Sequence, residues 1–153
     1  GLLYILAHSV AKGGLFLCCG IVEHNLHTKD IRVMGGLAKN MPFTALAFII
    51  CAFSVMGIPP LAGFFAKHLV IDGIVETGNI LIGAMFIASA VMTIMYLARL
   101  FVKVFLGPQT FPNVKEGTPI MVISVMILAV MSLLLGIFIY WPSQLATMAW
   151  GGM

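Results

Sequence analysis

Three titratable side chains stand out because they lie inside long apolar runs of the sequence. His8 and Lys12 are four residues apart in the first run, and Lys67 lies in the second run, ten residues after Gly57. If the first run is helical, residues four apart share one face about one turn apart. Two titratable groups at that separation can exchange a proton through a bridging water. The spacing of His8 and Lys12 therefore indicates a candidate proton relay.

The second apolar run is interrupted by the stretch Gly57–Pro60, which reads Gly-Ile-Pro-Pro. Two consecutive prolines, Pro59 and Pro60, cannot continue a helix, and they leave carbonyl groups upstream without helical partners. Such backbone survives at membrane depth only inside protein or against a water-filled cavity. A broken helix followed within two turns by Lys67 is therefore typical of an ion path. The alternative is an ordinary proline kink, with a structural lysine paired to a neighbour.

The composition places these residues in lipid. Of the 153 residues, 61% are apolar and only 8% are charged, whereas a soluble domain carries about 25% charged residues. So few charges cannot cover a globule with groups that tolerate water. This excludes soluble enzymes, nucleic-acid binders and secreted disulfide scaffolds, and the net charge of +3 is too small to indicate a nucleic-acid partner. We therefore expect an integral membrane protein whose surroundings are the lipid bilayer.

Four runs are long enough to cross a bilayer core of about 30 Å, which requires about 20 apolar residues. The expected spans are residues 1–22, 43–75 with the break, 80–106 and 120–141. No run alternates long enough for barrel strands. The expected fold class is all-α transmembrane, with residues 1–153 forming a single helical region of four spans. Because the first residue already lies in an apolar run, we expect this region to be part of a longer subunit.

The distribution of Lys and Arg predicts an orientation in the membrane. The first connection carries Lys29, Arg32 and Lys39, and the third carries Lys115, whereas the middle connection carries only acidic residues. Basic loops favour the cytoplasmic side, so both termini should face the opposite side. The membrane would be a prokaryotic plasma membrane or an equivalent energy-transducing membrane. Three aromatic residues fit a belt at the far interface: Tyr140, Trp141 and Trp150.

Several polar residues also have a simpler explanation. Lys12 could extend toward the interface while His8 bonds a neighbouring helix, although a lysine at the bilayer centre costs about 2.5–3.5 kcal/mol on insertion scales. His68 lies about 100° around the helix from Lys67, which favours a packing or interface histidine over a relay. Arg99 near the end of the third span is expected to be an interface anchor rather than a relay residue.

The cysteines do not indicate a metal or redox centre. Cys18, Cys19 and Cys51 lie in apolar runs, without the spacing of zinc ligands and without a His or Asp cluster beside them. There is also no cysteine cluster that could hold an iron–sulfur group. We expect these residues to behave as small buried hydrophobes, with no metal site and no cofactor on this chain.

Several motifs follow one another in a recognisable order. Residues His8–Gly20 fit the pattern H-x-x-x-K-x-x-x-F-x-x-x-G, and Met34–Leu37, Met41-Pro42 and Gly57–Lys67 come next. Residues Tyr96–Gly107 look like the following helix of the same pattern. Over about residues 3–107 the chain resembles the antiporter-like membrane subunits. These subunits occur in respiratory complex I, in energy-converting membrane-bound hydrogenases and in Mrp-type multisubunit cation/proton antiporters.

The resemblance implies that this chain forms the last four helices of a fourteen-helix unit built from two inverted repeats. Lys12 would be the lysine of the eleventh helix, with His8 beside it, and Lys67 the lysine of the broken twelfth helix. Tyr4 stands where many members carry a further histidine, which weakens a long histidine relay, and Ala66 stands where serine is common. The glutamate and lysines of the fifth, seventh and eighth helices are missing. Other membrane subunits, or the rest of this subunit, would supply those helices.

The resemblance also implies three possible functions. The first is a subunit that translocates protons or sodium ions in a redox-driven pump such as complex I or an energy-converting hydrogenase, with no redox active site on this chain. The alternative is a subunit of an Mrp-type cation/proton antiporter without redox chemistry. A second alternative is a structural membrane anchor whose charges join helices. Lys12 and Lys67 lie in separate polar or broken helices, which argues against the anchor.

Overall fold

The computed structural model describes residues 2–138, and within these residues the only regular elements are helices. The predicted end of the last span at residue 141 and the aromatic residues Tyr140, Trp141 and Trp150 lie outside the described part. The helices are α1 (Leu2–Leu26), the short η1 (Leu37–Lys39), α2 (Pro42–Met56), α3 (Ala62–Thr77), α4 (Ile80–Phe101), the π-helical η2 (Val102–Leu106) and α5 (Pro119–Ile137).

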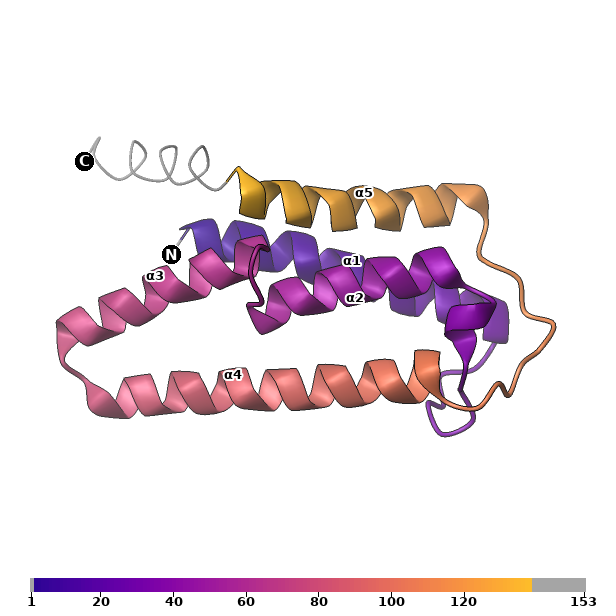
Figure 1. Cartoon of the computed structure of the whole chain (residues 1–153), viewed down its shortest axis with the longest axis horizontal. Coiled ribbons are helices and arrows are strands. Elements are labelled where there is room, and N and C mark those ends of the chain that lie inside the picture. Colours follow the sequence, from indigo (N-terminus) through magenta and orange to yellow (C-terminus); the bar gives the residue numbers. More distant parts are fainter. Residues whose placement is uncertain (1, 139–153) are drawn as a thin grey trace.

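The packed core lies between α1, α2 and α5. Ile21 of α1, Phe48 and Cys51 of α2, and Val125 and Ala129 of α5 are all buried there. Figure 1 shows that α3 continues beyond the end of α2, and that α4 runs back beside both of them. Few side chains of α4 are buried. In a bilayer such an apolar outer face meets lipid or other helices.

Within residues 2–138, three helices are long and apolar enough to cross a membrane, namely α1, α4 continued through η2 to Leu106, and α5. The apolar helix α2 is shorter, with 15 residues. The helical architecture of residues 2–138 and these long apolar helices agree with the prediction of an integral membrane protein.

Helix α1 continues through Leu26, beyond the predicted end of the first span at residue 22. Glu23 is polar but remains helical, and its carbonyl accepts a hydrogen bond from the His27 N–H at 2.8 Å. His27 then adopts a left-handed conformation with φ of 52°, which ends the helix. A change from apolar to polar residues therefore does not mark where this helix stops.

The interruption between α2 and α3 is built by Gly57 and the two prolines that follow. Gly57 adopts a left-handed conformation with φ of 84°, and its N–H donates to the carbonyls of Phe53 and Ser54 at 3.0 and 3.1 Å. This is a common way of ending a helix, and glycine adopts it without steric conflict. Pro59 and Pro60 occupy the connection, and α3 begins at Ala62.

The two basic connections lie together at one end of the bundle. The Asn40 side chain, before α2, donates to the Phe111 carbonyl at 2.5 Å and accepts from Gln109 at 2.9 Å. In the same region Glu116 caps α2, because its carboxylate accepts from the N–H of Thr44 at 2.8 Å and from the Thr44 hydroxyl at 3.0 Å. The connection between α3 and α4 lies at the opposite end (Figure 1).

Candidate functional site

A polar pocket of about 100 Å³ lies between α1, α3 and α4. His8 and Lys12 reach it from α1, and Lys67 reaches it from α3. All three are partly buried. Side chains from two regions of the sequence that are more than fifty residues apart therefore share one cavity. The other polar residues that line it are Tyr4, Ser89, Thr93 and Tyr96.

Lys67 folds back onto the end of α2. Its Nζ donates a hydrogen bond to the carbonyl of Met56 at 2.9 Å, and Met56 is the last residue of α2. The last carbonyl groups of a helix lack partners within the helix, so they need other donors. The Lys67 side chain also crosses Gly57, where an added Cβ would lie only 2.9 Å from Lys67 Cδ. The break therefore supplies both a hydrogen-bond acceptor for the ammonium and the space for its stem.

On α1, the imidazole of His8 stacks on the ring of Tyr4. The two ring centroids are 5.5 Å apart and the planes are inclined by 15°. Lys12 lies one turn further along the same helix face. Within residues 2–138, no carboxylate lies within ion-pair distance of Lys12 or Lys67. The pocket thus combines two lysines and a histidine without an acidic partner in the described part of the chain.

His68 and Arg99, the other two sequence candidates, are not among the residues that line this pocket. His68 is exposed on α3, where its Nδ1 lies 3.3 Å from a carboxylate oxygen of Asp72. Arg99 is exposed near the end of α4. The structure therefore groups His8, Lys12 and Lys67, and it separates His68 and Arg99 from them.

The sequence reasoning missed the contribution of α4. Ser89, Thr93 and Tyr96 are spaced by four and three residues, so they lie on one face of this otherwise apolar helix. The hydroxyl groups of Ser89 and Thr93 donate to backbone carbonyls of the preceding turn, at 2.7 and 2.8 Å. This polar stripe was the available signal for a third wall of the pocket.

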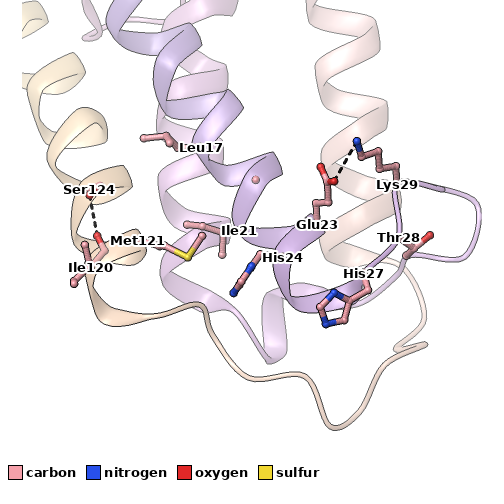
Figure 2. Close-up of a pocket in the computed structure, with 11 residues that line it drawn as sticks. Leu17, Ile21, Glu23, His24, His27, Thr28, Lys29, Ile120, Met121 and Ser124 are labelled. Atoms are coloured by element: carbon pink, nitrogen blue, oxygen red, sulfur yellow. Dashed lines mark hydrogen bonds and ion pairs between the residues drawn. The ribbon is translucent and has the colours of Figure 1, made fainter.

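A second, larger pocket of about 690 Å³ lies at the loop end of the bundle, between the end of α1 and the start of α5. Figure 2 shows His24 and His27 near Glu23, whose carboxylate pairs with the Lys29 ammonium at 3.1 Å. These side chains are mostly exposed. In the part of the chain that the structure describes, no three His, Cys, Asp or Glu residues are grouped so as to hold a metal ion.

The chain resembles known membrane subunits in sequence. Residues 1–93 match the family described as "NADH:quinone oxidoreductase/Mrp antiporter, TM". The chain is 37% identical over 142 residues to NADH-ubiquinone oxidoreductase chain 5 of Rhinoceros unicornis, with 90% of this chain and 23% of the relative covered. It is 32% identical over 149 residues to Na(+)/H(+) antiporter subunit A1 of Staphylococcus saprophyticus, with 88% of this chain and 18% of the relative covered. The chain therefore spans about a fifth of the length of these relatives.

Solved structures agree with these relatives. A chain of respiratory complex I from Thermus thermophilus superposes with a TM-score of 0.80 at 28% identity, covering 90% of this chain and 29% of that one. A chain of the Mrp complex from Dietzia sp. gives a TM-score of 0.80 at 23% identity, covering 95% and 35%, which shows the fold alone. The predicted resemblance to antiporter-like subunits is confirmed. This chain belongs to the NADH:quinone oxidoreductase/Mrp antiporter family of transmembrane subunits.

Proposed function

We propose that this chain is the translocating part of a redox-driven proton or sodium pump, with His8, Lys12 and Lys67 as its relay residues. The observation that supports the proposal best is the shared pocket. Side chains predicted separately from a helical spacing and from a helix break line one cavity of about 100 Å³. A polar cavity of that size has room for several waters, which protons need in order to move between side chains.

The chemistry of the three residues suits this role. A lysine ammonium donates a proton, and the neutral amine accepts one, so Lys12 and Lys67 can each carry a proton between waters. Histidine is the side chain that most readily changes charge near neutral pH. The Met56 carbonyl, 2.9 Å from Lys67 Nζ, offers an acceptor that holds the amine in place in either state.

The proposal includes the arrangement of the whole subunit. Helices α2 and α3 form the two halves of one broken span, so residues 1–153 constitute a single region of four spans. This region is the last part of a fourteen-helix subunit, and the basic connections face the cytoplasm while both termini face the other side. Other membrane subunits of the complex, or the rest of the same subunit, supply the missing helices and the remainder of the ion path.

The same fold also suits a secondary cation/proton antiporter. The observation that favours this second function is the 32% identity to a Na(+)/H(+) antiporter subunit over 149 residues. Identification of the subunits that co-purify with this chain would separate the two functions. Hydrogenase or quinone-module polypeptides would support the redox pump, and small Mrp-type subunits would support the antiporter.

The test of the relay is replacement of Lys67 in the complete complex. Lys67→Ala should lower ion translocation by about a hundredfold or more, because the carrier group is removed. Lys67→Arg should also impair it, since a guanidinium cannot be deprotonated in proteins. Ion translocation is measured in reconstituted vesicles and divided by the amount of assembled complex. Lys115→Ala, which removes an exposed lysine of the loop between α4 and α5, is the matched control.

Normal translocation by Lys67→Arg would show that Lys67 is not a proton carrier. If Lys67→Ala also translocated normally, Lys67 would be a structural charge, as expected for a membrane anchor. A loss of assembled complex in Lys67→Ala, without loss of activity per complex, would lead to the same conclusion.

A further inference from the structure

A small cavity adjoins the polar pocket at the helix break. The centre of a water molecule can occupy about 10 Å³ of this cavity. One buried water needs at least about 10–15 Å³ of volume defined in this way. The cavity shares Tyr4, His8, Val55 and Lys67 with the polar pocket of about 100 Å³. Its remaining lining comes from three helices: Ala7 of α1, Ser54 of α2, and Gly63 and Ala66 of α3.

Ser54 is the unusual member of this lining. It is 1% exposed, and its hydroxyl makes no hydrogen bond within the described part of the chain. Serine in a helix commonly donates to the carbonyl one turn earlier, as Ser89 and Thr93 do in α4. A buried hydroxyl without a partner is destabilising, so such groups are normally satisfied by protein or by an ordered water.

The contact between the two half-helices leaves space for that water. Gly63 lies in the first turn of α3 and packs against the last turns of α2, where an added Cβ would overlap the Ser54 carbonyl and lie 3.4 Å from its Oγ. A water needs two to four polar partners. The cavity lining offers the Ser54 hydroxyl, the Lys67 amine and the His8 imidazole.

We propose that this cavity is a single-water site, in which Ser54 positions a water between Lys67 and His8. The inference rests on the proposed function and specifies one step of it. The ammonium of Lys67 gives a proton to the water, and the water gives one of its own protons to a His8 ring nitrogen. Lys67 becomes neutral and His8 becomes charged, while the water is regenerated. The Ser54 hydroxyl donates a hydrogen bond to the water oxygen or accepts one from the water, and it neither loses nor gains a proton.

The test compares two buried serines in the complete complex. Ser54→Ala should lower ion translocation about fivefold or more, which is the rate change for losing one ordinary hydrogen bond at a transfer step. The solvent deuterium isotope effect on translocation should rise, because the proton transfer becomes more rate-limiting. Ser54→Thr retains a hydroxyl and should recover most of the rate. Ser132→Ala is the control, since Ser132 is equally buried, also lacks a hydrogen bond in the described residues, and lines neither cavity.

A purely structural Ser54 would behave differently. Removing a buried hydroxyl without a partner would then leave translocation unchanged and would stabilise the complex, as expected for Ser132→Ala. That result would overturn the inference, provided that Lys67→Ala still abolished translocation. If Lys67→Ala were active as well, the proposed function itself would fail.

A structural measurement tests the site without depending on activity. A high-resolution cryo-electron microscopy map of the assembled complex should show one water within about 3.2 Å of Ser54 Oγ, and the map of Ser54→Ala should lack it. A dry cavity in the unaltered complex would overturn the inference.

Discussion

The two polar regions of the molecule differ in volume, in charge and in the surroundings of their charged groups. The loop-end pocket holds about 690 Å³ and collects Glu23, His24, His27 and Lys29. The pocket among the helices holds about 100 Å³ and contains only three strongly basic or titratable nitrogen groups. By size and by number of titratable groups, the loop-end pocket would be the better candidate for a functional site.

The surroundings reverse this order. At the loop end, Glu23 and Lys29 pair with each other at 3.1 Å while both remain largely exposed, and such surface pairs contribute little free energy. Between the helices, Lys67 has a backbone carbonyl as its partner, and an isolated charge in lipid is costly. A costly group that persists calls for a function, whereas a solvated ion pair does not.

The strongest test of this contrast is the pair His8 and Lys12. Lys12→Ala should lower ion translocation by about a hundredfold, because a carrier site is lost. His8→Ala should cost less, since water can bridge a missing imidazole. The double variant should be little worse than Lys12→Ala alone, as expected for two groups that act in series and are therefore not additive. Translocation by both single variants and the double variant in reconstituted vesicles measures this.

Strictly additive losses, or a larger defect in His8→Ala than in Lys12→Ala, would contradict a paired relay. Lys12 would then be a structural charge of α1.

An intermediate effect is expected at Gly57. In Gly57→Ala the new Cβ would lie 2.9 Å from Lys67 Cδ and would displace the lysine from the Met56 carbonyl. Translocation should fall about tenfold, because a misplaced transfer group reacts much more slowly. Gly78→Ala is the matched control, since Gly78 also has a positive φ, of 67°, but has open space around it. Both variants carry the left-handed penalty of about 1–2 kcal/mol.

Thermal stability and translocation, measured on the same preparations, separate the two effects at Gly57. If Gly57→Ala and Gly78→Ala lost equal stability and equal activity, backbone strain alone would explain the loss, and the position of Lys67 would not matter.

The smallest effect is expected at the loop end. His24→Ala and Glu23→Gln should change translocation by less than about twofold, because substitutions at exposed sites rarely shift free energies by more than about 0.5 kcal/mol. The rate of ion uptake by vesicles checks this. A large loss in either variant would show that the loop-end pocket belongs to the ion path, and the contrast between the two regions would disappear.

Some of this site could be predicted from short-range patterns. The four-residue spacing of His8 and Lys12 places both on one face of any helix. Pro59 and Pro60 prevent a continuous helix through the second apolar run. The all-helical class follows equally directly from long apolar runs. These features depend on local geometry, which a sequence carries explicitly.

Other parts depend on contacts that no local pattern encodes. Lys67 reaches the Met56 carbonyl only because Gly57 turns the chain back toward it. Glu116 caps a helix that begins more than seventy residues earlier. The unpaired hydroxyl of Ser54 is meaningful only once the neighbouring half-helix is placed against it. Each case needs the three-dimensional path of the chain, which spacing alone does not supply.

Each end of helix α2 is bonded to a charged side chain from another part of the chain. The Glu116 carboxylate accepts a hydrogen bond at the N-terminal end, and the Lys67 ammonium donates one at the C-terminal end. A helix is an electric dipole with its positive end at the N-terminus, so each of these two charges has the sign that stabilises the helix end beside it. If Lys67 gives up its proton, the compensation at the C-terminal end is lost. The uncovered negative end then attracts the next cation to the same place. The short helix α2 would thus favour the return of a proton to Lys67 through its electrostatic field, without any movement of the helix.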